Sequence, residues 1–177
     1  RNTGALGIWL AFEPNGLDGQ DQGFVNDAAR LSNEAGRFAS YWSRAGGTGQ
    51  NTIMTEEDMT KTTLNLSGTP YNSWYTCPRD SKRTCLLDPY ADTVAGKEML
   101  MTSISVPLLV NGKAIGVVGI DISLDALQAA ALNAQRDLFN GAGHMLIVSG
   151  SGVLAGNSVD ASKLGKNLAE ALGNDGK

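Results

Sequence analysis

The chain has 177 residues, enough for one domain with a hydrophobic core, or for one domain and part of a second. Its net charge of −4 leaves no basic stripe, which argues against nucleic acid as a partner and mildly favours a cationic ligand. No apolar run reaches the length of about 18 residues that a membrane-spanning helix requires, so no span is expected. The chain opens at Arg1 without a signal peptide, and we interpret it as a piece of a longer protein.

The first half of the chain contains short, mixed elements. Residues 5–12 form a compact apolar segment that a Pro-Asn-Gly turn ends, and helical spacing of apolar residues predicts a short amphipathic helix over 22–35. Residues 37–42 have the pattern of a strand. A capping box that begins at Thr55 predicts a helix over 56–66, and one helical turn is expected near 72–77.

The middle of the chain has the clearest pattern. A strand is predicted over 84–90, and residues 97–110 alternate as a long strand does. Asn111 and Gly112 form the strongest hairpin signal in the sequence, because both tolerate the positive φ that a tight turn requires. The return strand is predicted over 113–121.

A helix is predicted over 124–139, with Ser123 as its N-cap. Residues 144–148 and 152–155 then form a second hairpin, and 160–172 form another short helix. Antiparallel ribbons with helices between them predict an α+β fold, without the βαβ repeat of a parallel sheet.

Aromatic residues and acids gather in the stretch from 74 to 121. Trp74, Tyr75 and Tyr90 are followed by two carboxylates, Asp92 and Asp121. Asp121 closes an otherwise apolar strand, where an acid is costly unless a partner satisfies it. Aromatic faces attract a cation and carboxylates pair with its N–H groups, so this set predicts a cation-binding site.

Each residue of this set also has a structural interpretation. Asp121 could cap the following helix, although Ser123 is better placed for that role, and Asp92 could belong to a turn. The aromatic residues could simply be core residues. The two acids could also serve as the pair of a glycoside hydrolase, but no other feature indicates a sugar cleft.

Other kinds of chemistry find little support in the sequence. The single histidine, His144, lies in a separate predicted hairpin, far from either cysteine, and no metal site or cofactor motif is expected. Cys77 and Cys85 are eight positions apart, and they would form a disulfide in an oxidising compartment or remain free thiols in the cytosol.

The sequence resembles a known family at several motifs. The pattern S-W-Y, L-D-P-Y-x-D, M-L-M-T-S-I-S-V-P-L and N-G-K-A-I-G-V-V-G-I-D-I-S-L is similar to the periplasmic double-Cache sensor domains of bacterial chemoreceptors, as are F-E-P-N-G-L-D-G-Q-D and R-F-A-S-Y-W-S-R. The similarity covers nearly the whole chain and is densest from 72 to 127. It implies a double-Cache, PAS-like fold in which antiparallel sheets are flanked by helices.

The resemblance also implies a division into modules. Residues 1–122 would form the membrane-distal, ligand-binding module, residues 123–139 a linking helix, and residues 140–177 the start of the membrane-proximal module. The long N-terminal helix and the rest of the proximal module would lie outside this chain.

Members of this family that bind α-amino acids carry Arg-x-Trp, then Tyr-x-Asp, then a distant Asp. The corresponding positions here are Trp74, Tyr90 with Asp92, and Asp121. The arginine position is Asn72, so the resemblance implies a site that binds an ammonium group but lacks the guanidinium that would hold a carboxylate.

The expected ligand is therefore a small cationic amine: a polyamine such as putrescine or spermidine, or a biogenic amine such as histamine. Tyr75, Tyr41 and Trp42 are expected to help wall its aliphatic part. Choline remains an alternative, because an aromatic box would hold a quaternary amine without N–H donors. An amino acid or γ-aminobutyrate also remains an alternative, because Arg79 or Arg83 could supply a displaced carboxylate anchor.

The resemblance implies a non-enzymatic sensor, the periplasmic domain of an inner-membrane receptor that acts as a homodimer. Its expected output is methyl-accepting chemotaxis signalling, with a histidine kinase or a cyclase as alternatives. Export to the periplasm would favour the disulfide between Cys77 and Cys85.

Overall fold

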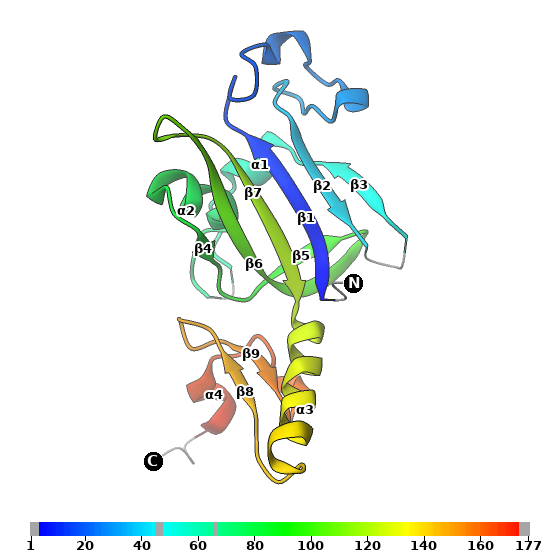
Figure 1. Ribbon diagram of the computed structural model, residues 1–177, viewed down its shortest axis with the longest axis vertical. Helices are drawn as coiled ribbons and strands as arrows, with labels where there is room; N and C mark the ends of the chain where they lie inside the picture. Colours follow the sequence, from blue (N-terminus) through cyan, green and yellow to red (C-terminus); the bar gives the residue numbers. More distant parts are fainter. Residues whose placement is uncertain (1–3, 45–47, 66, 174–177) are drawn as a thin grey trace.

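The computed structural model describes residues 4–44, 48–65 and 67–173, and it has the predicted α+β architecture. A large antiparallel sheet forms the upper part of the molecule, and a second, two-stranded sheet lies below it, alongside helix α3 (Figure 1). In this part of the chain, no helix is long and apolar enough to cross a bilayer.

The large sheet has seven strands. Along its main path the order is β3-β2-β1-β7-β6-β4, and β5 pairs with the first part of β6. The bounds are β1 Ala5–Phe12, β2 Ala39–Ser43, β3 Gln50–Ile53, β4 Cys85–Leu86, β5 Tyr90–Val94, β6 Lys97–Val110 and β7 Lys113–Ser123.

The predicted β6–β7 hairpin is confirmed. Asn111 and Gly112 have φ of 50° and 75°, as a tight hairpin turn requires. Strand β7 lies between β6 and β1, and its Asp121 is paired with Ser103 of β6 on one side and with Gly7 of β1 on the other. Asp121 therefore lies in the middle of the sheet, between two neighbouring strands.

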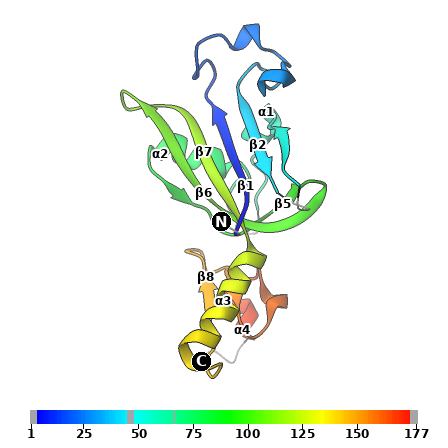
Figure 2. The ribbon, with the colours of Figure 1, turned by 45° about the vertical axis from the view of Figure 1, so that its right-hand side comes forward.

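One face of the large sheet is covered by two short helices, α1 (Glu56–Thr60) and α2 (Ser73–Ser81), which lie behind the strands in Figures 1 and 2. Met59 of α1 and Trp74 of α2 enter a common hydrophobic core with Trp9 and Val117 of the sheet. Burial of these side chains holds both helices, which are too short to be stable on their own.

The lower part begins at α3 (Leu124–Phe139), which Ser123 caps by accepting a hydrogen bond from the backbone N–H of Ala126 at 3.2 Å, as predicted. It continues with β8 (Leu146–Val148), β9 (Leu154–Asn157) and α4 (Leu168–Leu172). The predicted second hairpin is present, but the helix expected over 160–172 is divided into a 3₁₀ turn at Ala161–Lys163 and α4.

The predicted helix over 22–35 is wrong. The segment forms only two 3₁₀ turns, Asp21–Gly23 and Ala28–Arg30. Asn26 and Leu31 have left-handed backbone conformations, and the Asp27 side chain accepts a hydrogen bond from the backbone N–H of Arg30, a local turn that competes with a helix.

Three other boundaries also differ. The predicted strand over 84–90 is two strands, because Pro89 has no N–H to continue the ladder. The helix expected over 56–66 ends at Thr60, although its Thr55 capping box is confirmed. Helix α2 continues past the predicted turn and through Pro78, which is itself fully buried.

Candidate functional site

A pocket of about 140 Å³ lies between the covered face of the large sheet, helix α1 and strand β5. Its wall is mostly aromatic and acidic. The lining residues are Trp9, Tyr41, Thr52, Ile53, Met54, Asp58, Tyr71, Trp74, Tyr90, Asp92, Thr93, Val94 and Asp121.

Asp121 is the deepest acid of the pocket, and only 3% of its surface is exposed. Its Oδ1 accepts hydrogen bonds from Trp9 Nε1 at 3.1 Å and from Ser103 Oγ at 2.6 Å. Ser103 Oγ is also 2.7 Å from the hydroxyl of Tyr90. These contacts hold one carboxylate oxygen in place, and the hydroxyl of Tyr41 also faces this carboxylate and favours its ionised form.

Two glycines of the sheet make room for the aromatic walls. A Cβ at Gly119 would lie 2.1 Å from the indole ring of Trp9, so the absence of a side chain lets that ring lie against β7. A Cβ at Gly7 would lie 2.4 Å from the hydroxyl of Tyr41. Trp9 and Trp74 then meet edge to face, with ring centroids 4.7 Å apart.

A second acid, Asp92, enters the pocket from β5. Its Oδ2 accepts a hydrogen bond from the hydroxyl of Tyr71 at 3.0 Å, and its Oδ1 accepts one from the backbone N–H of Thr93 at 2.7 Å. A third acid, Asp58, comes from helix α1, where its carboxylate also closes the capping box with Thr55.

The buried acids of the pocket are costly to ionise. Burial raises the pKa of Asp121 to about 6, although the hydrogen bonds from Ser103 and Trp9 favour the ionised form, and the nearby charge of Asp92 adds to the increase. Burial also raises the pKa of Asp92. The pKa values of Tyr41 and Tyr71 are raised by burial and by these carboxylates, so both phenols stay protonated.

The pocket offers a cation several partners and an anion few. None of its lining residues is an arginine or a lysine. The hydroxyl of Tyr41 is buried beside Asp121 and favours the ionised form of that acid, and within the part of the chain that the structure describes it has no partner in good hydrogen-bonding geometry, so it can turn to a bound molecule. Carboxylates together with aromatic faces are the groups that bind an organic ammonium ion.

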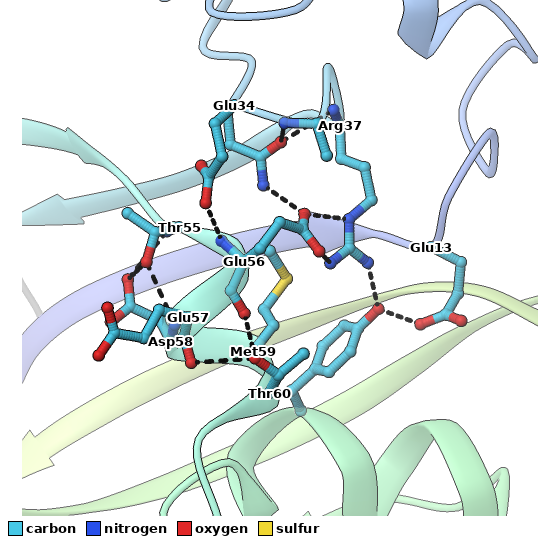
Figure 3. Close-up of polar contacts among 12 residues, drawn as sticks. Glu13, Glu34, Arg37, Thr55, Glu56, Glu57, Asp58, Met59 and Thr60 are labelled. Carbon is cyan, nitrogen blue, oxygen red and sulfur yellow. Dashed lines mark hydrogen bonds and ion pairs between the residues drawn. The ribbon is translucent and has the colours of Figure 1, made fainter.

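Helix α1 is held in place by a partly buried ion pair between Arg37 and Glu56 (Figure 3). The guanidinium of Arg37 binds both carboxylate oxygens of Glu56, with Nε–Oε1 at 2.7 Å and Nη2–Oε2 at 2.5 Å. It also donates to the hydroxyl of Tyr75 at 3.0 Å, which in turn donates to Glu13. This cluster fixes the helix that carries Asp58.

The structure brings together five of the eight residues that the sequence predicted for the site. Trp74, Tyr90, Asp92, Asp121 and Tyr41 line one pocket, so the two acids share a cavity that Trp74 borders.

The other three predicted residues lie outside the pocket. Tyr75 belongs to the Arg37 cluster, and Trp42 is 40% exposed beside a different hollow. Asn72 is buried and donates from Nδ2 to the backbone oxygen of Met59 at 3.0 Å, so it holds α1 to α2.

Among the aromatic and acidic residues of the pocket, sequence reasoning missed three: Trp9, Asp58 and Tyr71. Trp9 had a usable signal, because it alternates with Gly7 on a strand and needs a polar partner for its indole N–H when buried. Asp58 was explained as part of a capping box, and Tyr71 carried no signal.

The two arginines considered as displaced carboxylate anchors do not line the pocket. Arg79 forms an ion pair with Asp80 at 2.6 Å, and its guanidinium lies over the ring of Tyr75. Cys77 and Cys85 form a disulfide that joins α2 to β4. This bond braces the helix that presents Trp74.

Comparison with known proteins identifies the family. Residues 1–129 match the methyl-accepting chemotaxis protein-like, first PDC sensor domain. The methyl-accepting chemotaxis protein TlpQ of Pseudomonas aeruginosa PAO1 is 48% identical over 171 residues, which are 96% of this chain and 24% of TlpQ. The chain thus spans about a quarter of the length of this curated relative.

Two solved structures extend the comparison. The extracellular domain named as that of histidine kinase mmHK1S-Z3 superimposes with a TM-score of 0.70 at 25% identity, over 94% of this chain and 54% of that one. A protein named methyl-accepting chemotaxis protein X gives 0.68 at 28% identity, over 92% and 54%. The chain therefore belongs to the first PDC sensor domains of methyl-accepting chemotaxis protein-like receptors, a family of ligand-binding sensor domains.

Proposed function

We propose that this sensor domain binds a small organic cation that carries at least one ammonium group. The observation that supports this most strongly is the composition of the pocket: Asp58, Asp92 and Asp121 line it together with five aromatic residues, and no basic residue lines it. A cation would stabilise the ionised form of acids that burial makes costly to ionise.

In the proposed complex, the ammonium group donates to the carboxylate of Asp121 and to Asp92. The hydroxyl of Tyr41, which is buried and has no partner in good hydrogen-bonding geometry in the described structure, completes its coordination. Trp9 and Trp74 pack against the aliphatic part of the ligand and attract its charge through their ring faces.

The residue at position 72 supports a ligand that has an amine group and does not need a carboxylate group for binding. The side-chain amide of Asn72 already donates a hydrogen bond to the backbone oxygen of Met59, so it is not available to bind the carboxylate of a ligand. Polyamines such as putrescine and spermidine, and biogenic amines such as histamine, fit this chemistry. Choline, α-amino acids and γ-aminobutyrate are the competing ligands that the experiment must separate.

We further propose that the chain is the periplasmic part of a membrane receptor, with residues 1–122 as the ligand-binding module, 123–139 as a linker and 140–177 as the start of a second module. The separate small sheet alongside α3 and the match of residues 1–129 to a first sensor domain support this division. The disulfide is consistent with an oxidising compartment. Chemotaxis signalling by a homodimer is the proposed output.

The proposal is tested by thermal shift and calorimetry with amines, choline, amino acids, γ-aminobutyrate and organic acids. Amines should raise the melting temperature, by an amount that corresponds to about 2.7 kcal/mol at a ligand concentration 100 times Kd. Asp121→Asn should abolish amine binding and keep the fold, because an asparagine oxygen can still accept from Trp9 and Ser103.

Asp137→Asn, an exposed change on α3, is the matched control and should bind as the parent chain does. Stronger binding of α-amino acids or γ-aminobutyrate than of any amine would refute the proposed ligand class.

A further inference from the structure

A second hollow of about 400 Å³ adjoins the pocket, and we name it the outer compartment. It is lined by Lys61, Thr63, Leu64, Asn65, Tyr71, Ala91, Asp92, Thr93 and Glu98. Tyr71, Asp92 and Thr93 line both spaces, so these three residues form the boundary between the pocket and the outer compartment. The two hollows are therefore neighbours on either side of Tyr71 and Asp92.

The boundary already holds a positive charge on its outer side. The ammonium of Lys61 lies 4.6 Å from the centroid of the Tyr71 ring. Lys61 lines the outer compartment and not the pocket, so its ammonium is on the outer side of that ring. The hydroxyl of the same ring donates to Asp92, and the lysine charge favours the ionised form of that acid.

The outer compartment also contains a carboxylate that is not engaged. Glu98 is exposed at the start of β6, opposite Thr93 in the β5–β6 register. Within the described residues, no ion pair joins Lys61 to any acid. The ammonium of Lys61 therefore lies over the ring of Tyr71, in a hollow that Asp92 and Glu98 also line, and no direct charge pair among the described residues holds it there.

We propose that the outer compartment is a second cation subsite, in which Lys61 is a tethered competitor for the distal ammonium of the ligand. This inference rests on the proposed function and narrows its ligand class to linear di- and polyamines. One ammonium binds Asp121 in the pocket, and a second displaces Lys61 from Tyr71 and pairs with Asp92 and Glu98. Lys61 then sets how strongly long polyamines are preferred over monoamines.

The test is calorimetric titration with spermidine and with butylamine, which has one ammonium and a short chain. Lys61→Met removes the competing charge and keeps an unbranched side chain, so it should tighten spermidine binding about three- to tenfold, the value of one cation–aromatic or ion-pair contact. Glu98→Gln should weaken spermidine binding by a similar factor. Neither change should alter butylamine binding by more than about twofold.

Lys97→Met is the matched control, because it also removes one lysine charge. Lys97 is next to Glu98 in the sequence but lines neither the pocket nor the outer compartment. This change should leave spermidine binding unchanged. If Lys61→Met and Lys97→Met tighten spermidine equally, or if Lys61→Met changes butylamine as much as spermidine, general electrostatics explains the effect and the subsite is refuted. If the parent chain binds neither amine, the proposed function itself fails.

Discussion

The unliganded domain should lose stability as the pH rises through the titration of Asp121. The pKa of this carboxyl is about 6 in the folded chain, against an ordinary value of 3.8. Between these two values the folded state binds more protons than the unfolded state, so the free energy of unfolding falls with rising pH. The loss begins near pH 4 and is complete above pH 6.

The structure gives the size of this effect. The difference between 3.8 and about 6 corresponds to ~3 kcal/mol, because each pKa unit is equivalent to about 1.4 kcal/mol. Burial is the dominant cause, and only 3% of the surface of Asp121 is exposed, so solvent screening reduces the value little. Asp80 and Asp160 have lowered pKa values and act in the opposite direction.

The assay is therefore a difference measurement: urea unfolding of the parent chain and of Asp121→Asn at several values between pH 4 and pH 8. The variant cannot titrate at this position, so its stability relative to the parent should increase by up to ~3 kcal/mol across the range. A parallel pH dependence in the two chains would refute the assignment of a buried, hard-to-ionise acid.

Ligand binding provides an independent measurement of the same group. A bound ammonium lowers the pKa of Asp121, so amine affinity should rise with pH up to about 6, and binding near pH 6 should release protons. Calorimetry in buffers of different ionisation enthalpy measures this release directly. An amine that binds equally well at pH 5 and pH 7, without proton release, would contradict the proposed pairing.

Three further predictions concern the scaffold of the pocket. Gly119→Ala should displace the indole of Trp9, lower the free energy of unfolding in urea by about 1–3 kcal/mol and weaken amine binding in calorimetry. Gly23→Ala, where an added Cβ meets no atom within 4 Å, is the control and should change neither stability nor binding. Cys85→Ser should lower the free energy of unfolding by about 2.5 kcal/mol, because the disulfide closes a loop across a sequence separation of 8 and so reduces the entropy of the unfolded chain. Dithiothreitol should lower the melting temperature of the parent chain and not that of the variant. Arg37→Met should lower the free energy of unfolding by about 1–3 kcal/mol, because it leaves the partly buried Glu56 without its cation, and adding Glu56→Gln should restore part of this in a double-mutant cycle.

Local patterns determined much of the fold. The alternation over 97–110, the Asn111-Gly112 turn and the Ser123 cap predicted β6, β7 and α3, because each signal depends on backbone conformations of neighbouring residues. The helix predicted over 22–35 was wrong, because apolar residues at helical spacing do not show whether a core is available to bury them. Helix α2 continued through Pro78 for the converse reason, because buried packing overrode a local signal.

The candidate site divides in the same way. Asp121 was predictable, because an acid that ends an apolar strand requires a partner wherever that strand lies. Trp9, Asp58 and Tyr71 come from three other elements, and their convergence depends on sheet order and on the position of α1.

The sequence by itself determined which residue types could bind a cation and which strand would carry the central acid. Only the tertiary structure decided that Trp9, rather than Tyr75 or Trp42, lies beside this acid, because a long-range strand pairing sets Trp9 against Gly119. Such pairings join positions more than a hundred residues apart, and no local pattern records which side chain will occupy the space that a distant glycine leaves.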